Sequence, residues 1–188
     1  MTGFYVALVH YPVLDRRGDT ITTAVTNLDV HDIARSARTY DTAGYFVVTP
    51  IEAQKKLVQR ILDHWRIGSG AERVPERKEA LSICEIVPSI EDAVTAITER
   101  EGQRPKVWVT GARLRDGTEA ISERDARERL KEHPTLVLFG TGYGLERSAI
   151  DAADAILPPI VGGGSYNHLS VRAAAAITID RLRAPEPH

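Results

Sequence analysis

Short runs of apolar residues alternate along this chain with longer stretches in which apolar positions recur every three or four residues. The short runs predict strands over residues 4–9, 45–48, 81–87, 107–110, 135–139 and 155–157. The periodic stretches predict helices over residues 29–40, 51–65, 90–101, 122–131 and 170–182. Strands that alternate with helices predict an α/β fold, in which helices cover both faces of a mainly parallel sheet.

Two polar stretches interrupt this alternation, at residues 67–78 and 113–118. Both combine Gly or Pro with several arginines and lysines, so we expect them to be loops. Asp29 is the expected N-cap of the first predicted helix, over residues 29–40.

Two glycine-rich loops in the last third of the chain carry the candidate chemistry. Gly140, Gly142 and Gly144 follow the predicted strand 135–139, and a run of three glycines at 162–164 precedes an alanine-rich helix. Glycines let backbone N–H groups approach a ligand closely. For Gly140, Gly142 and Gly144 alone, a tight turn between strand and helix is the better explanation, and the second loop shifts the balance to ligand binding. Their spacing is neither G-x-G-x-x-G nor a P-loop, which argues against dinucleotides and nucleoside triphosphates.

The two loops together resemble the second and third motifs of the SPOUT (SpoU and TrmD) RNA methyltransferases. Residues 167–175 follow much of the SpoU third motif, and Asn27 and Arg35 resemble the Asn and Arg of its first motif. The segments HYPV (10–13), 22–40, FGTGYGL (139–145) and YNHLSVR (166–172) are similar to a family of stand-alone SPOUT proteins described as SAM-dependent RNA methyltransferases. This resemblance spans nearly the whole chain.

The resemblance implies a fold, a cofactor and partners. Residues 1–188 would form one SPOUT domain that ends in a deep trefoil knot, without an appended RNA-binding domain. The implied cofactor is S-adenosylmethionine, the implied substrate is transfer or ribosomal RNA, and the implied assembly is a homodimer with active sites between its subunits. The cofactor would contact Thr110, Gly111, Ala112, Phe139, Gly140, Thr141, Gly142, Gly144, Leu157, Pro158, Ile160, Tyr166, Asn167, His168, Leu169 and Ser170. Asn167 and Ser170 are equally suited to capping the final helix.

The predicted helix after Asn27 supplies the catalytic candidates. Asn27, Asp29 and Arg35 are the expected catalytic residues. Arg35 stays protonated and would position the substrate or stabilise charge, so Asp29 and His31 are the candidate bases.

The candidate RNA contacts are basic side chains. Helical spacing brings His31 and Arg38 to one exposed face with Arg35, and Arg73 and Arg77 lie in the first polar stretch. These four side chains, His31, Arg38, Arg73 and Arg77, are the expected RNA contacts. A solvated helix face and a solvated loop are the alternative explanations.

Composition narrows this picture. A chain of 188 residues with 43% hydrophobic content suits one globular core, and a net charge of −2 requires any RNA contact to come from a local patch. The single cysteine, Cys84, cannot form an internal disulfide, and neither a zinc site nor any other metal site is expected. No stretch reaches the about 18 apolar residues of a membrane span, and the start lacks a signal-peptide pattern. We therefore expect a cytoplasmic protein.

Two other functions are compatible with these residues. The chain could be a non-catalytic SPOUT-fold module that binds S-adenosylmethionine or RNA. It could also be a different nucleotide-binding enzyme, which the missing phosphate-loop spacings disfavour.

Overall fold

A computed structural model describes residues 2–114 and 118–185 of the chain. Its centre is a six-stranded sheet in the order β5-β4-β1-β7-β6-β8, in which every neighbouring pair is parallel. The strands are β1 (Phe4–Val9), β4 (Gly44–Val48), β5 (Cys84–Val87), β6 (Lys106–Val109), β7 (Thr135–Gly140) and β8 (Ala155–Ile156). The predicted parallel α/β sheet is therefore confirmed.

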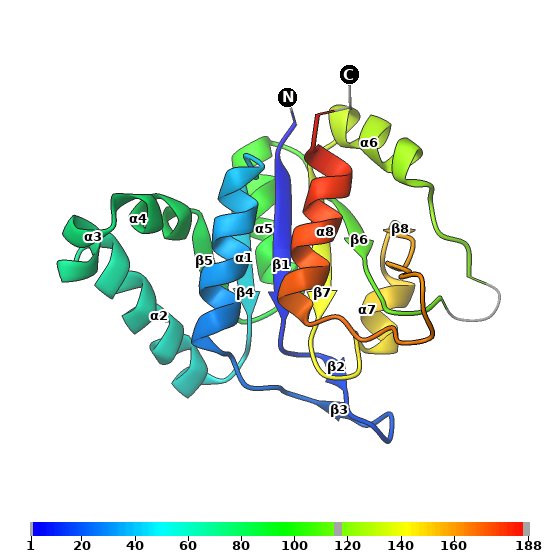
Figure 1. Ribbon diagram of the computed structural model, residues 1–188, viewed down its shortest axis with the longest axis horizontal. Helices are drawn as coiled ribbons and strands as arrows, with labels where there is room; N and C mark the ends of the chain where they lie inside the picture. The colour runs from blue at the N-terminus through cyan, green and yellow to red at the C-terminus, as the bar shows by residue number, and fades with distance from the viewer. Residues whose placement is uncertain (1, 115–117, 186–188) are drawn as a thin grey trace.

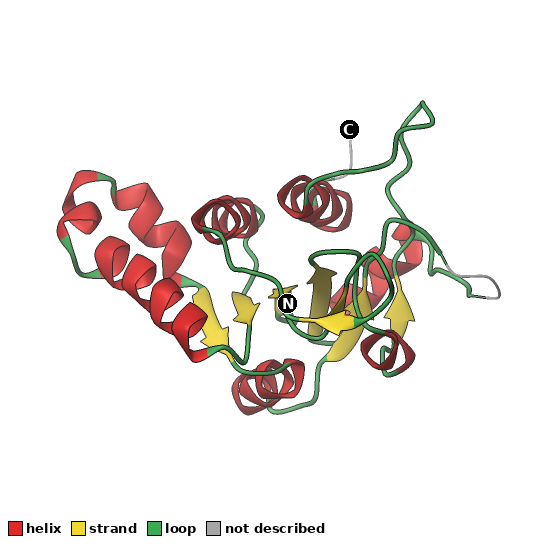
Figure 2. Cartoon of the chain, turned by 90° about the horizontal axis from the view of Figure 1, so that it is seen from below, coloured by secondary structure: helices red, strands yellow, loops and turns green. Residues whose placement is uncertain are grey.

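Helices cover both faces of this sheet, as Figures 1 and 2 show. The helices are α1 (Asn27–Thr39), α2 (Glu52–Arg66), α3 (Ser69–Arg73), α4 (Pro75–Ser82), α5 (Ile90–Glu101), α6 (Glu123–Glu132), α7 (Arg147–Asp151) and α8 (Val171–Arg183). Strand β1 divides its side chains between two cores because successive residues point to opposite faces. Val6 and Leu8 pack with α1, α2, α4, α6 and α8, while Ala7 and Val9 pack with α5 and α7.

The chain also forms a small hairpin from β2 (Val13–Leu14) and β3 (Thr20–Ile21), directly after β1. Two-residue strands carry too little alternation to be predicted from sequence. The hairpin matters because an isolated bridge joins Val13 to Leu145, in the loop that follows β7. This pairing brings two segments from opposite ends of the chain together.

The region between α2 and β5 differs from the prediction. Residues 67–78, expected to be a loop, contain α3 and the first half of α4. Pro75 occupies the first turn of α4, where its fixed φ suits a helix and its missing N–H costs nothing. The predicted strand 81–87 is correspondingly too long, because Leu81 belongs to α4 and the strand begins at Cys84.

The start of α1 also differs from the prediction. The N-cap is Thr26, whose hydroxyl accepts a hydrogen bond from the Asp29 N–H at 3.2 Å. Asp29 instead lies in the first turn of the helix, where its carboxylate accepts a hydrogen bond from the Thr26 hydroxyl at 2.6 Å. Thr26 is favoured as the N-cap because these two reciprocal hydrogen bonds satisfy both the Asp29 N–H and the Thr26 hydroxyl.

The trefoil knot that the resemblance implies stays a prediction. Residues 115–117 lie outside the described residues, so the predicted loop over 113–118 is seen only at its two ends. In the part of the chain that the structure describes, none of the helices has the length and apolar character needed to cross a bilayer.

Candidate functional site

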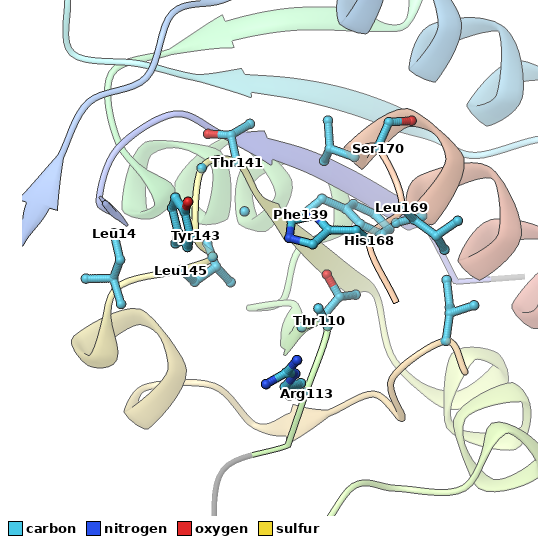
Figure 3. A pocket seen from close by; sticks show the side chains of 18 of the residues that line it. Leu14, Thr110, Arg113, Phe139, Thr141, Tyr143, Leu145, His168, Leu169 and Ser170 are labelled. Carbon is cyan, nitrogen blue, oxygen red and sulfur yellow. The ribbon is translucent and has the colours of Figure 1, made fainter. Parts of the chain in front are cut away.

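A cavity of about 890 Å³ opens at the carboxyl ends of β6 and β7, beneath the start of α8. The carboxyl edge of a parallel sheet is where ligands bind in open α/β folds, and the volume lies in the range of small-molecule sites. Its walls come from four separate parts of the chain, which are the hairpin and start of α1, the segment after β6, the loop after β7, and the segment leading into α8. In Figure 3 the side chains of Thr110, Phe139 and His168 gather around this space.

The structure brings nearly all of the expected cofactor residues together in this cavity. The lining includes Thr110, Gly111, Ala112, Phe139, Gly140, Thr141, Gly142, Gly144, Pro158, Ile160, Asn167, His168, Leu169 and Ser170. Two expected residues are elsewhere. Leu157 is buried in the core at 3% exposure, since it continues the line of β8, and Tyr166 is 81% exposed to solvent.

The first glycine loop has backbone conformations that favour glycine at two positions, Gly142 and Gly144, where φ is +61° and +103°. Gly142 has a φ of +61°, and a Cβ at this position would lie 2.8 Å from the Leu14 carbonyl oxygen. That carbonyl accepts a hydrogen bond from the Tyr143 N–H at 2.9 Å, and the Leu14 N–H donates to the Gly144 carbonyl at 2.9 Å. The loop therefore lies against the β2 hairpin, with its backbone held on the hairpin side.

The second loop is fixed at its end rather than at its glycines. The Asn167 side-chain amide donates to the Ala112 carbonyl oxygen at 3.0 Å and so joins the segment after β6 to the segment before α8. Ser170 is the N-cap of α8, and its hydroxyl accepts from the Ala173 N–H at 3.3 Å. Capping and lining are thus compatible, because both side chains belong to the cavity wall.

One charged group lies in the wall on the α1 side. Asp29 is only 8% exposed, and its second carboxylate oxygen is 3.3 Å from the Arg172 guanidinium of α8. Arg172 also lies 3.5 Å from Asp32, one turn farther along α1. This bridge joins α1 to α8 and holds a carboxylate at the edge of the cavity.

A chain of hydroxyl groups ties the first loop to the end of β1. The Thr141 hydroxyl donates to the Val9 carbonyl oxygen at 3.0 Å and is hydrogen-bonded to the Thr23 hydroxyl, which lies 3.0 Å from His10 Nδ1. His10 is fully buried, and this burial lowers the pKa of its imidazole to about 4, although the Asp29 charge acts in the opposite direction. His10 is therefore neutral at physiological pH.

The other catalytic candidates do not line this cavity. Asn27 begins α1 and is exposed, and Arg35 is exposed two turns farther along the helix. Of the three expected catalytic residues, Asp29 alone is among the lining residues of the described chain.

The expected RNA contacts lie on the far side of α1 from the cavity. His31 was predicted to be exposed, but its ring packs edge-on against Trp65 of α2, with ring centroids 5.5 Å apart. Arg77 lies over the same indole at 4.5 Å, and burial together with Arg77 lowers the pKa of His31. The predicted exposure of His31 is wrong because this face of α1 packs against α2 and α4; its contact with RNA stays a prediction.

Arg38, predicted to share that exposed face, is instead held by acidic residues. Its guanidinium pairs with Asp41 at 3.0 Å and with Glu79 of α4 at 2.7 Å. Arg73 ends α3 and is exposed, away from the cavity lining. The interface between α1 and α4 therefore accounts for Arg38 without RNA.

Several lining residues were missed by the sequence analysis. They are Leu14, Thr23, Ala24, Arg113, Leu114, Tyr143, Leu145, Ile150, Val171, Ala174 and Thr178. Those next to a glycine motif follow from it by adjacency, whereas Leu14 and Thr23 have no local signal because only the pairing of the hairpin with the distant loop brings them to the cavity. Among residues 2–114 and 118–185, no group of three or more His, Cys, Asp or Glu side chains is placed to hold a metal ion.

The chain is similar in sequence to known and predicted RNA methyltransferases. The family described as SAM-dependent RNA methyltransferase matches residues 3–184 of the chain. A tRNA (guanine-N(1)-)-methyltransferase from Oleidesulfovibrio alaskensis is 43% identical over 180 residues, which cover 96% of this chain and 42% of that protein. An uncharacterized protein from Aquifex aeolicus is 37% identical over 178 residues, which cover 95% of this chain and 87% of that protein.

A solved structure gives the same fold at low sequence identity. The SpoU methyltransferase AviRb from Streptomyces viridochromogenes, in complex with the cofactor AdoMet, is similar with a TM-score of 0.54 at 18% identity. The similarity covers 95% of this chain and 56% of that one. The chain thus has a SpoU-type fold, and it spans less than half the length of the tRNA (guanine-N(1)-)-methyltransferases that it matches.

Proposed function

Because the chain belongs to the family of SAM-dependent RNA methyltransferases, we propose that it transfers a methyl group from S-adenosylmethionine to RNA, and that the RNA is a transfer RNA. The name of the relatives at 43% and 44% identity supports transfer RNA over ribosomal RNA. Such a reaction, together with a reduced buried Cys84, fits the cytoplasm.

The described cavity suits S-adenosylmethionine in size and chemistry. Its glycine backbone and the apolar side chains of Phe139, Leu145 and Ile150 suit the flat, largely apolar face of an adenine. The Asp29 carboxylate in the wall favours a ligand that carries positive charge, as this cofactor does at its sulfonium and ammonium groups. We therefore assign the cofactor to the lining residues of this cavity.

The bound cofactor supplies an electrophilic methyl group. The protein must then hold the nucleophile of the RNA in line with that group and accept its proton. We propose that Asp29 does both. Each of its carboxylate oxygens has one partner, Thr26 or Arg172, and retains a lone pair for an incoming N–H or O–H. His31 is the weaker candidate because its ring packs against Trp65.

Asn27 and Arg35 have their proposed roles in a homodimer. Both are exposed on α1, and Leu28 between them is 60% exposed, an apolar side chain suited to a subunit contact. In a dimer with active sites between its subunits, these residues would approach the cavity of the partner chain. Arg35 would there contact the RNA or stabilise developing charge.

Two of the proposed RNA contacts outside the cavity, His31 and Arg77, pack against Trp65. His31 and Arg77 flank this indole, and the Arg35 charge also acts on His31. Stacking on the indole pre-orients the Arg77 guanidinium for a phosphate. Arg73 would extend this edge, whereas Arg38 would have to exchange its acidic partners for RNA.

The observation that carries this proposal is the convergence of both glycine loops and Asp29 on one cavity. Its test is methyl transfer from tritiated S-adenosylmethionine to unmodified transfer RNA, with cofactor binding measured by calorimetry. We expect Asp29→Asn to bind the cofactor more weakly, because the negative charge is lost from the wall, and to lose methyl transfer even when the cofactor is saturating. The matched control is Asp32→Asn, which removes the other, exposed carboxylate beside Arg172.

Two results would contradict this proposal, one for the identity of the base and one for methyl transfer itself. Native rates in Asp29→Asn would remove Asp29 as the base. Saturable cofactor binding without transfer to either transfer or ribosomal RNA would favour the alternative function, a non-catalytic module that binds S-adenosylmethionine or RNA.

A further inference from the structure

His10 is fully buried beside the candidate cofactor site, yet it does not line the cavity. It follows β1 directly, and its main chain is held on two sides. The His10 N–H donates to the Val48 carbonyl at 2.9 Å, and its carbonyl accepts from the Thr23 N–H at 3.0 Å. One ring nitrogen, Nδ1, faces Thr23, and the other, Nε2, is buried without a hydrogen-bond partner in the described part of the chain.

Counting hydrogens fixes the direction of every bond in this chain. A carbonyl oxygen can only accept, so the single Thr141 hydroxyl hydrogen is used on Val9. The Thr23 hydroxyl must then donate to Thr141, which leaves Thr23 only as an acceptor toward His10. His10 Nδ1 must therefore carry a hydrogen, and Nε2 carries the lone pair.

This protonation pattern excludes one role and indicates another. The chain of donors ends on a backbone carbonyl, so it cannot pass a proton out of the cavity, and His10 is not the general base. A buried acceptor without a partner costs stability, and Nε2 gives the ring no second hydrogen bond within the described residues. The bond from Nδ1 to Thr23 is the only side-chain bond of His10 in the described residues, so its function is carried by that bond.

We propose that His10 is a positioning residue for the methyl-donor site, acting through Thr23 and Thr141 on the loop that begins at Gly140. The Nδ1–H holds the Thr23 hydroxyl in its donating direction, and Thr23 donates to the Thr141 hydroxyl, which itself donates to the Val9 carbonyl oxygen. Thr23 and Thr141 both line the cavity, so this chain sets the position of its wall. The inference rests on the proposed function, because the ligand of that wall is taken to be S-adenosylmethionine.

The first test needs no ligand. Nitrogen-15 NMR of the imidazole in the intact protein reports which ring nitrogen carries the hydrogen. We expect a neutral ring with the hydrogen on Nδ1 at pH 7. A neutral ring with the hydrogen on Nε2, or a charged ring at pH 7, would overturn the inference even if the protein bound no cofactor at all.

The second test is calorimetric and kinetic, with S-adenosylmethionine as the probe. Thr23→Val preserves the shape of the side chain and removes the hydroxyl, and His10→Leu removes the donor. We expect each to weaken cofactor binding roughly two- to tenfold, the effect of one lost hydrogen bond. The KM for the cofactor should rise while kcat at saturation stays close to the native value. His10→Asn should restore binding, because its side-chain amide can donate from the place of Nδ1.

The double variant and a control make this result specific. His10→Leu with Thr23→Val should bind no more weakly than the weaker single variant, because both changes break one chain. Thr42→Val is the matched control, since the Thr42 hydroxyl is buried, has no hydrogen-bond partner among the described residues and does not line the cavity. Cofactor affinity equal to native in both Thr23→Val and His10→Leu would refute the positioning role. Failure of the native protein to bind the cofactor would count against the proposed function, while the NMR result would still decide the tautomer.

Discussion

Gly142→Ala tests the way in which the first glycine loop is held against the hairpin. Alanine at a φ of +61° adopts a left-handed conformation that costs about 1–2 kcal/mol relative to glycine. The new Cβ would also lie 2.8 Å from the Leu14 carbonyl oxygen, closer than real Cβ contacts allow. Since that contact is with backbone, the hairpin or the loop must move.

The movement breaks hydrogen bonds that join the two segments. Leu14 exchanges one bond with Tyr143 and one with Gly144, both at 2.9 Å, and each contributes about 0.5–1.5 kcal/mol. With the backbone strain, the free energy of unfolding should fall by roughly 2–5 kcal/mol. This is a large part of the about 5–15 kcal/mol that stabilises a typical domain. Binding of S-adenosylmethionine should weaken as well, because the shifted loop lines the cavity.

Gly102→Ala separates strain from collision. Gly102 has a φ of +71°, ends α5, and has no atom within 4 Å of the position of a Cβ. Urea unfolding of this variant should show a loss of only about 1–2 kcal/mol, with native cofactor binding by calorimetry. If Gly142→Ala were no less stable than Gly102→Ala, the close approach of loop and hairpin would not hold in solution, and our account of the loop would be wrong.

Three further predictions concern groups around the same core. His10 has a pKa of about 4 in the folded chain against 6.5 for a free imidazole. Between these two pH values the imidazole is protonated in the unfolded chain but not in the folded one, which favours unfolding. Stability should decline by about 3 kcal/mol between pH 6.5 and pH 4 in urea titrations, and His10→Asn should flatten that decline; an unchanged profile would contradict the assignment. Arg172→Met should reduce stability by about 1–3 kcal/mol, because Asp29 is then nearly buried without its cation, and adding Asp29→Asn should recover part of the loss; additive losses would show that the pair is not coupled. Burial raises the pKa of the Cys84 thiol to about 12, so iodoacetamide should label Cys84 only in denaturant, and rapid labelling of the native protein would mean that β5 opens.

The regular elements could be predicted because their apolar pattern is strong. Strand β1 and helix α5 have the predicted bounds, since six consecutive apolar residues are typical of a buried strand and a clear helical period ends at Gly102. Helix α4 lacks such a signal, because its buried residues, Ala80 and Leu81, are adjacent rather than periodic. Its sequence is therefore indistinguishable from a charged loop until it packs on α1 and α2.

The candidate site was partly predictable for the same kind of reason. The glycine loops can be recognised from consecutive residues, and residues of both segments line the cavity, as predicted. Thr23 and Leu14 reach that cavity only through contacts with residues more than a hundred positions away, such as the Thr23–Thr141 bond with a sequence separation of 118. The exposure of His31 was predicted wrongly because the pattern of a single helix does not show which neighbouring side chain, here Trp65, will cover it.

The strand order has a consequence for the chain as it is being made. Strands β1, β4 and β5 are adjacent in the sheet and come from the first half of the chain, so they can assemble while the rest is still unmade. Until β7 appears, β1 is an edge strand of six buried-type residues with one side unpaired, and such edges attract other chains. Long-range parallel pairing is also slow to form. A fragment that stops before β7 should therefore aggregate. Cofactor binding should appear only after the whole chain has folded, because the cavity needs residues from both ends of the chain.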